Sequence, residues 1–357
     1  MIAILAALLA AAPGPFEQYL SDNETSCIGK ADFALAQSET WQANGFTFVA
    51  SGAKLEVKAE KKGAAKLGLL SAVKDFSPET KKNLEVYLAA FKKAGVTAIV
   101  VDGDSAYGVD DQDSTLADVF SFLGDQGLPV YVIIGNSESR SAFNRGALAA
   151  FRKNHNVINL NLVRRVDGDG YTLVSLPGYF DRRFIGETSG CDYKAEDAQE
   201  LGKIARGATN PVVLVTHGPP RQAGKGALDV TQDGKNVGDP DLATAIAEGK
   251  IAFGVFGHIL ESGGRATDLE GTHSIKPGAK AASIFVNPGP AFADPWPLND
   301  GRSSKGMAAI LSLDGKNSTW EQVLAGALEK PKAVKAAKGT KGKKAAPKKP
   351  EAAEKAE

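Results

Sequence analysis

The feature that most constrains the fold is a series of short apolar runs that alternate with helical patterns. Continuous runs of this kind are typical of strands that are buried on both faces and covered by helices. Ser77 and Pro78 are suited to the N-cap and the first turn of the first predicted helix. The predicted strands are 66–70, 97–101, 129–134, 171–176, 211–216, 251–256 and 283–286, and the predicted helices are 77–93, 114–123, 140–152, 195–206 and 241–248. The alternation predicts an α/β fold.

Two parts of the chain depart from this alternation. The runs 307–313 and 318–323 have no helix between them, which favours antiparallel pairing at a sheet edge. The stretch 21–62 contains short strand-like pieces. We expect it to form a β-ribbon extension of a main domain at 63–326.

The first residues form an uncharged apolar run that ends in three alanines, Ala10 to Ala12. An apolar run followed by small residues is typical of a secretory signal peptide, and this run is too short to span a bilayer. No Lys or Arg precedes it, which departs from the usual pattern. We expect residues 1–20 to be a signal peptide and the protein to be exported, periplasmic or extracellular, with no stable membrane span.

Charge is divided unevenly along the chain. Lys and Arg number 42 and Asp and Glu number 42, but the segment from Pro331 onward holds nine Lys and three Glu. The rest is therefore acidic, which excludes a strongly cationic nucleic-acid-binding domain. The tail at 327–357 is rich in Lys, Ala and Pro, and we expect it to be disordered because it lacks residues that build a core. Such a tail could bind an anionic polymer.

Two cysteines, Cys27 and Cys191, are too few for a disulfide scaffold or a zinc knuckle. A bound metal must therefore rest on His, Asp and Asn. In an oxidising compartment the two cysteines could pair. The alternative is two unrelated buried residues, and the sequence leaves both open.

Polar residues follow four of the predicted strands. They are Asp104 after 97–101, Asn136 after 129–134, His217 after 211–216 and His258 after 251–256. The carboxyl ends of strands meet along one edge of an open α/β sheet, where such proteins build their sites. Each residue taken alone is more often structural than functional. Four in succession indicate a site.

The order of these motifs resembles the calcineurin-like metallophosphoesterase family. The strings are Gly103-Asp104, Gly135-Asn136, His217-Gly218-Pro219-Pro220, Gly257-His258 and Asn287-Pro288-Gly289, and the resemblance extends over about 66–323. It implies a four-layer α-β-β-α sandwich of two mixed sheets. It also implies two divalent ions, about 3.5–4 Å apart, that share a carboxylate and activate a water for attack on a phosphoester.

Four positions depart from the family pattern. The first family motif, Asp-x-His, corresponds here to Ala72 and Lys74, and the second His of the Gly-His-x-His motif is Leu260. These three positions would serve one of the two metal sites. Ser137 stands where the family has a phosphate-contacting His. The resemblance therefore implies a divergent member with an incomplete dinuclear site.

The ligands that the family uses for the other site are all present. They are Asp104, Asn136, His217 and His258. One carboxylate, one amide oxygen and two imidazoles suit one divalent ion such as Mn²⁺, Fe²⁺ or Zn²⁺. We expect one metal to bind and the second site to be absent.

Lys74 falls beside the depleted site in the motif comparison. Its ammonium could pair with Asp104 or hold a phosphate in place of the missing metal, and the alternative is an ordinary exposed loop lysine. The expected catalytic residues are Lys74, Asn136 and His217. Further anion-binding candidates, with plain surface charge as the alternative, are Arg182, Arg183 and Arg265.

Three functions fit these residues. The first is metal-dependent hydrolysis of a phosphoester, weak because a positioned proton donor is commonly worth about 10²–10⁴ in rate and one metal is missing. The second is an inactive binding protein with a phosphoesterase fold, which would hold a phosphorylated or acidic ligand. The third is a structural envelope protein that acts through its tail. Specificity would lie in the loops 105–114 and 221–239.

Overall fold

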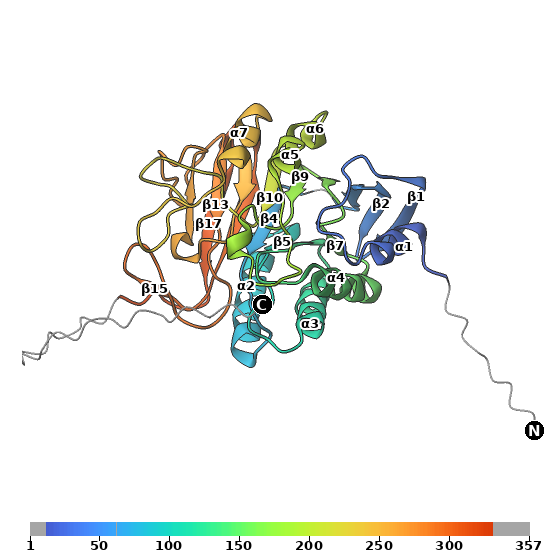
Figure 1. The fold of residues 1–357 in the computed structure, drawn as a ribbon, viewed down its shortest axis with the longest axis horizontal. Coiled ribbons are helices and arrows are strands. Elements are labelled where there is room, and N and C mark those ends of the chain that lie inside the picture. The colour runs from blue at the N-terminus through green and yellow to red at the C-terminus, as the bar shows by residue number, and fades with distance from the viewer. Residues whose placement is uncertain (1–11, 62, 331–357) are drawn as a thin grey trace, which may run out of the picture.

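The computed structural model describes residues 12–61 and 63–330 (Figure 1). Most of the predicted signal peptide, 1–11, and most of the basic tail, 331–357, lie outside the described residues.

Two large sheets dominate the described part of the chain (Figure 1). The nine-stranded sheet consists, in spatial order, of β1 (Ala34–Ala43), β2 (Phe46–Gly52), β3 (Lys54–Ala59), β8 (Arg165–Gly168), β9 (Tyr171–Leu176), β10 (Val212–Thr216), β11 (Phe253–Val255), β13 (Ile284–Asn287) and β12 (Arg265–Thr267). The six-stranded sheet consists of β17 (Thr319–Leu324), β16 (Met307–Leu313), β4 (Ala65–Leu70), β5 (Ala98–Asp102), β6 (Val130–Ile133) and β7 (Val157–Asn159). A small pair is formed by β14 (Trp296–Pro297) and β15 (Ser303–Ser304).

Both large sheets are mixed. β4, β5, β6 and β7 run parallel, and β16 joins them antiparallel. β9, β10, β11 and β13 also run parallel, whereas β8 and β12 are antiparallel to their neighbours. The antiparallel pairing of β16 with β17 is the one predicted from the missing helix between them.

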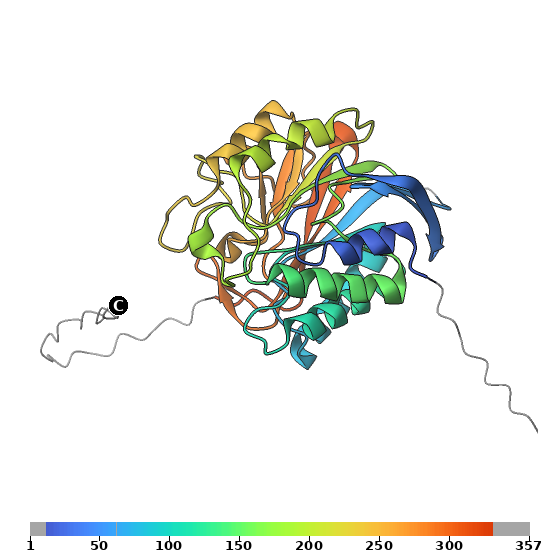
Figure 2. The same cartoon turned by 45° about the vertical axis from the view of Figure 1, so that its right-hand side comes forward.

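Helices cover the outer face of each sheet. They are α2 (Pro78–Ala94), α3 (Gln112–Gly124), α4 (Arg140–Asn154), α5 (Ala195–Gln199), α6 (Leu201–Ala205) and α7 (Pro240–Glu248). The described chain also contains α1 (Pro15–Asp22) and the short 3₁₀ turns η1 (Arg182–Phe184), η2 (Leu260–Ser262) and η3 (Gly315–Asn317). α2, α3 and α4 pack on the six-stranded sheet, and α5, α6 and α7 pack on the nine-stranded sheet (Figure 2). The single helix predicted at 195–206 is therefore two short helices, α5 and α6.

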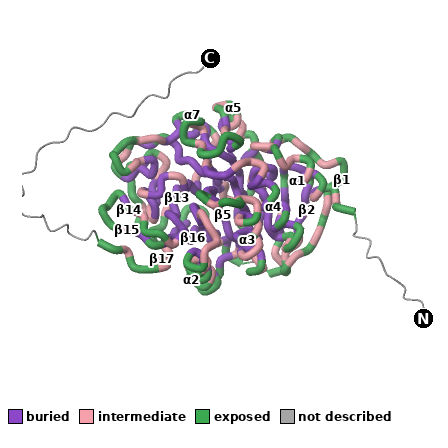
Figure 3. Tube along the Cα trace, turned by 60° about the horizontal axis from the view of Figure 1, so that its bottom comes forward, coloured by how far each residue is buried: buried purple, intermediate pink, exposed green. Residues whose placement is uncertain are grey.

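The largest core lies between the two sheets. Alternation along β5 shows how the layers form: Ala98 and Val100 point to the other sheet, and Ile99 and Val101 point to the helices. Figure 3 shows the buried segments along the strands, with exposed positions on the outer helices and loops. The predicted four-layer α-β-β-α sandwich is confirmed.

Local signals at the first long helix act as predicted. Ser77 Oγ accepts a hydrogen bond from the Thr80 N–H at 3.2 Å, and Pro78 occupies the first turn. Gly95 ends the helix in the left-handed region at φ 71°.

The N-terminal region differs from the predicted division of the chain. β1, β2 and β3 do form an antiparallel ribbon, but β3 pairs in parallel with β8. The strands of this stretch, at 34–59, are therefore part of the nine-stranded sheet rather than an appendage. Ahead of it, Phe16, Tyr19 and Leu20 of α1 are buried in the main core, so residues 15–20, which we assigned to the signal peptide, belong to the folded domain.

No helix in the described ranges is long and apolar enough to cross a membrane.

Candidate metal centre

The carboxyl ends of strands from both sheets meet at one edge of the sandwich. Asp104, Asn136, His217 and His258 follow β5, β6, β10 and β11, in that order. The ligand atoms of Asp104, His217 and His258 all lie within 4.8 Å of one another. The structure thus brings together side chains that are far apart in the sequence.

Asn136 completes this group. Its Oδ1 lies 2.8 Å from His217 Nε2 and 2.7 Å from His258 Nδ1. The Asp104 Oδ1 lies 3.3 Å from His217 Nε2 and accepts a hydrogen bond from the Asn136 N–H at 3.1 Å. One carboxylate, one amide oxygen and two imidazole nitrogens therefore face the same small volume.

His217 is oriented by the backbone of the neighbouring strand. The imidazole is fully buried, and its Nδ1 lies 3.1 Å from the carbonyl oxygen of Asp102. With Nδ1 donating there, Nε2 is turned toward Asp104 and Asn136. A second-sphere contact of this kind is common for imidazoles that bind metals.

Charge is distributed unequally between the two imidazoles. Burial lowers the pKa of His217, but the Asp104 carboxylate more than offsets this and raises it to about 9. Burial and the nearby charge of His217 lower the pKa of His258 to about 3. In the metal-free chain, His217 and Asp104 therefore form a buried ion pair, so binding of a cation would release a proton from His217.

Asp102 supports the centre through its backbone. Its side chain is fully buried, and within the described part of the chain neither carboxyl oxygen has a hydrogen-bond partner. Burial raises the pKa of this carboxyl well above its usual value. The Asp102 carbonyl oxygen also accepts a hydrogen bond from Ser71 Oγ at 2.8 Å.

Glu138 is a supporting residue that the motif reading did not identify. Its carboxylate accepts hydrogen bonds from the backbone N–H groups of Ser105, Ala106 and Gly135. Burial raises its pKa to about 7. Glu138 thereby ties the loop after β5 to the loop after β6. Its position directly after Gly135-Asn136-Ser137 is the sequence feature that could have identified it.

Close packing explains the glycines that precede two of the ligands. A Cβ added to Gly103 would overlap His217 Nδ1, and a Cβ added to Gly135 would overlap Asp104. Gly103 also has a φ of 68°, in the region that side chains disfavour. These positions require glycine for the ligands to approach each other.

The loop 177–194 closes over one side of the centre. The Phe184 carbonyl accepts a hydrogen bond from Asn136 Nδ2 at 2.7 Å, and the Gly186 N–H donates to the Asn136 carbonyl at 2.8 Å. The Tyr179 ring lies 4.2 Å from the His258 ring, between centroids. This loop fixes the orientation of the Asn136 amide.

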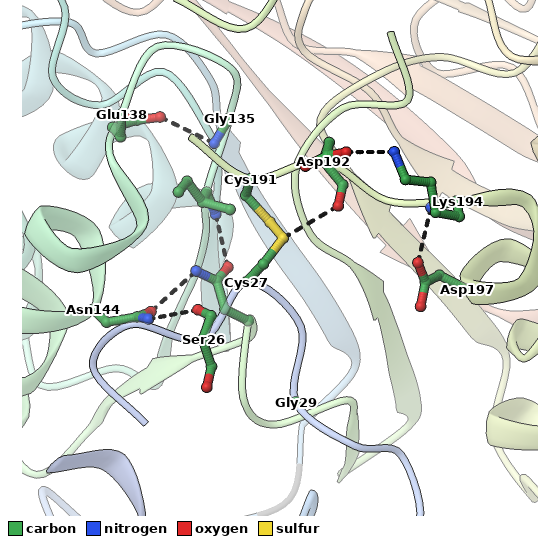
Figure 4. Close-up of a disulfide and its surroundings, with 12 residues drawn as sticks. Ser26, Cys27, Gly29, Gly135, Glu138, Asn144, Cys191, Asp192, Lys194 and Asp197 are labelled. Carbon is green, nitrogen blue, oxygen red and sulfur yellow. Dashed lines mark hydrogen bonds and ion pairs between the residues drawn. A yellow bond between two sulfur atoms is a disulfide. The ribbon is translucent and has the colours of Figure 1, made fainter. Parts of the chain in front are cut away.

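A disulfide anchors the same loop. Cys27 and Cys191, whose pairing the sequence left open, are bonded across 164 positions (Figure 4). Figure 4 shows the bridge beside Gly135 and Glu138 of the loop after β6. The Cys191 carbonyl accepts a hydrogen bond from the Tyr179 N–H at 3.1 Å.

Three of the positions that depart from the family pattern, Ala72, Lys74 and Leu260, lie outside the group of candidate ligands. The Ala72 N–H donates to the Gly103 carbonyl at 3.0 Å, so the depleted motif runs beside the ligand loop. Ala72, Leu260 and Phe292 form one buried apolar cluster, with Trp296 packed against it. This cluster offers no donor to a metal.

Lys74 lies next to that cluster. Its N–H donates to the Asp104 carbonyl at 3.0 Å, and its ammonium lies 4.5 Å from the ring centres of Phe292 and Trp296 and 5.1 Å from that of Tyr107. Three rings around one ammonium form a cation–π cage. Burial lowers the pKa of Lys74, and the charge of Asp104 acts against this.

The backbone on this side is held in an uncommon conformation. Ala72, Lys74 and Asp104 have φ values of 48°, 63° and 52°. Positive φ costs energy for residues with a side chain and concentrates at functional sites. The strain lies in the two loops that meet at Asp104.

Ser137 and the remaining histidines do not supply the proton donor that the family places at this site. Two of the candidate anion-binding arginines are paired with carboxylates. Ser137 is buried, and its N–H donates to Asp104 Oδ1 at 3.1 Å. The chain's other histidines lie elsewhere: His155 ends α4, and His273 pairs with Asp268. Among the arginines, Arg182 pairs with Asp192 and Arg183 pairs with Asp181.

The donor set fits a metal. Two imidazole nitrogens with a carboxylate and an amide oxygen are suited to Zn²⁺, Mn²⁺ or Fe²⁺. Asp104, His217 and His258 could hold such an ion, and Asn136 Oδ1 faces both imidazoles.

Comparisons with known proteins bear on the fold. No protein-family model matches the chain, and no curated protein matches it in sequence. TT1561 of Thermus thermophilus is similar in structure, with a TM-score of 0.51 and 15% identity over 74% of this chain and 100% of that one. A dimetal phosphatase from Danio rerio is similar with a TM-score of 0.44 and 12% identity over 74% of this chain and 99% of that one. GAP50, the anchor in the inner membrane complex of Plasmodium, is similar with a TM-score of 0.46 and 14% identity over 74% of this chain and 85% of that one.

These likenesses concern the fold alone, because the identities are low. The two facing mixed sheets with helices on both outer faces are the architecture that the motifs predicted. The fold is the four-layer α-β-β-α sandwich that the resemblance to calcineurin-like metallophosphoesterases implied.

Proposed function

We propose that this protein is a divergent phosphoesterase that binds one divalent metal ion and hydrolyses a phosphoester weakly. The observation that carries the proposal is the asymmetry around Asp104. Metal-ligating side chains gather beside it, and an apolar cluster with a caged lysine occupies the depleted positions. A centre of this kind can hold one ion.

Each nearby residue has a separate role in this proposal. A bound divalent ion supplies a Lewis acid that polarises a phosphoryl oxygen and a water. Asp104 is held by backbone N–H groups of the next loop, and His217 is held by the Asp102 carbonyl. The Lys74 ammonium donates no hydrogen bond to another described residue, so its N–H groups are free to hold a phosphoryl oxygen.

Two features make the expected turnover slow. A second cation, which would share the charge of the phosphoryl oxygens, has no ligands at Ala72 and Leu260. Ser137 occupies the position of the family's phosphate-contacting histidine, so no imidazole is placed to protonate the leaving group. Loss of such an acid commonly lowers the rate by about 10²–10⁴.

A second candidate function follows from the same two features. With neither a second ion nor a proton donor, the site could bind a phosphorylated or acidic ligand without turnover. The buried apolar cluster at Ala72, Leu260 and Phe292 favours this alternative, because it replaces catalytic groups with stable packing.

Metal analysis tests the first part of the proposal. We expect the purified chain to bind about one Mn²⁺ or Zn²⁺ per molecule, and His217→Ala or His258→Ala to abolish binding. The exposed His273 is the control, and His273→Ala should bind metal normally. Two tightly bound ions per chain would contradict the assignment of the depleted side.

An activity assay separates the two functions. The metal-loaded chain would be incubated with a panel of phosphomonoesters and phosphodiesters, and inorganic phosphate release would be measured. Slow release that disappears in His258→Ala supports hydrolysis. Binding of the same phosphoesters without any release supports the binding protein.

We also propose that the protein is exported. The Cys27–Cys191 disulfide supports this, because such bonds persist in oxidising compartments. Since Phe16 of α1 is buried in the core, a leader would end before Pro15, close to Ala12. N-terminal sequencing of the mature protein tests this, and an intact cytoplasmic chain with two free thiols would contradict it.

A further inference from the structure

A cavity outside the group of candidate metal ligands borders the turn η2. Its volume is about 470 Å³, within the usual range for small-molecule sites. It is bordered by the loop after β10, the turn and strand at 261–265, and the segment after β14. Glu261 lines this cavity, and neither Lys74 nor any of the candidate metal ligands is among its lining residues.

Arg265 is the residue that distinguishes this cavity. It is partly buried on β12 and lines the cavity wall. Within the described residues its guanidinium makes no hydrogen bond and no ion pair. A guanidinium carries five donors, and leaving them unpaired in a partly buried position is unfavourable. Arg182 and Arg183, by contrast, are paired with carboxylates.

The other charged groups of the cavity leave the excess positive. Asp300 acts electrostatically on Arg265, but its carboxylate is engaged by Arg302, at 2.9 Å to the Nε. Glu261 accepts a hydrogen bond from the Gln232 N–H at 3.1 Å. Lys225 lines the same cavity and has no partner among the described residues. An amide N–H leaves the charge of Glu261 in place, so with Asp300 paired to Arg302 the cations Arg265 and Lys225 exceed Glu261 by one positive charge.

The other residues that line the cavity indicate which kind of ligand it could hold. Ala227, Val230 and Leu298 contribute apolar surface. A ligand that matches this cavity has an anionic group for Arg265 and Lys225 and a compact, largely uncharged body.

We propose that this cavity is a second binding site, for the carboxylate or phosphate group of a small organic anion, with Arg265 as its principal anchor. A planar guanidinium matches either group with paired hydrogen bonds. Lys225 adds a second positive charge. The proposal does not depend on the metal centre or on phosphoester hydrolysis.

The test measures anion binding in the absence of metal. The full chain, freed of metal with EDTA, would be titrated calorimetrically with inorganic phosphate and separately with acetate. We expect saturable binding of at least one probe, and whichever probe binds more tightly identifies the preferred anionic group. Arg265→Ala should weaken this binding at least tenfold, because a hydrogen bond to a charged group is worth that much.

Three further variants make the outcome decisive. Arg265→Lys keeps the positive charge but lacks the planar guanidinium, so it should bind with intermediate affinity. It also replaces Arg265→Ala in the test if that variant fails to fold. Arg145→Ala removes a surface arginine paired with Asp113 and should bind like wild type. Lys74→Ala should also retain binding, because Lys74 faces the other site. The proposal is overturned if the folded wild-type chain binds neither probe, if both Arg265 variants bind like wild type, or if only Lys74→Ala loses binding.

Discussion

Lys74 is held in place by aromatic rings. The ammonium lies over Phe292 and Trp296, and Tyr107 borders it on the third side. Cation–π contacts of this kind contribute about 0.5–2 kcal/mol and restrict a flexible side chain. Because the rings engage the ammonium without hydrogen bonds, its three donors stay available to an anion.

A lysine substitution tests this role. Lys74→Ala should weaken phosphate binding by the metal-loaded chain about tenfold, the value of one charge-assisted hydrogen bond. Calorimetric titration measures the affinity. Lys81 is the matched control, because its ammonium also lies over two rings, Phe76 and Phe122, away from the centre. Equal affinity in wild type, Lys74→Ala and Lys81→Ala would remove Lys74 from the site.

Asp268 makes the stability of the fold depend on pH. Burial raises its pKa, but hydrogen bonds from Thr272 and His273 outweigh burial and lower it to about 2. A carboxyl whose pKa is lower in the folded chain stabilises the fold above the unfolded pKa, about 3.9. That stability is lost as the pH falls toward 2.

We therefore expect the difference in unfolding free energy between wild type and Asp268→Asn to shrink as the pH falls from 4 to about 2. Chemical denaturation at several pH values measures it. A difference that stays constant over this range would show that the hydrogen bonds do not depend on the charge.

At the scale of elements, the disulfide joins the N-terminal segment to the loop 177–194. That loop binds Asn136 through the Phe184 carbonyl and the Gly186 N–H. The bridge therefore acts on both stability and the geometry of the centre. Its effect on the centre is indirect, because neither cysteine forms a hydrogen bond with a candidate metal ligand.

Removal of the bridge should be costly. The double variant Cys27→Ala/Cys191→Ala should lose about 2–5 kcal/mol of unfolding free energy, because the closed loop is long. Its metal affinity should also fall, since the loop that orients Asn136 is released. Wild type in the presence of a reductant is the control and should match the variant. Unchanged stability and metal affinity would show that packing alone holds the loop.

At the scale of the whole molecule, the N-terminal strands are part of the sandwich. β3 pairs with β8 within the long sheet, and Phe48, Leu55 and Val57 are buried in the core between the sheets. α1 adds Phe16, whose ring stacks on Trp41 at 5.2 Å between centroids. These residues close one end of the core.

Deletion of 12–61 should therefore abolish cooperative unfolding. It would expose the edge of β8 and the apolar face beneath it. Calorimetry and near-ultraviolet circular dichroism would show the loss. A chain that lacks only 1–11 is the control. A truncated chain with a cooperative transition near that of the control would support the separate ribbon that we first expected.

Much of this architecture could be predicted because its signals are local. Apolar runs such as 171–176 coincide with a strand, and Ser77 caps the helix that it was expected to begin. The candidate ligands could be found for the same reason, since each follows a strand directly. That these residues bind a metal ion and take part in catalysis stays a prediction.

The sequence by itself determined most of the strands and helices and the residues at the ends of the strands, because periodicity and turn signals act over a few neighbouring residues, and the four-layer sandwich was implied by the family resemblance. The tertiary structure alone decided that Cys27 bonds to Cys191, that β3 joins β8, that Lys74 lies among three rings and that Arg265 faces a cavity without a partner among the described residues. Each of these depends on which distant segments come into contact, and local patterns carry no record of such contacts.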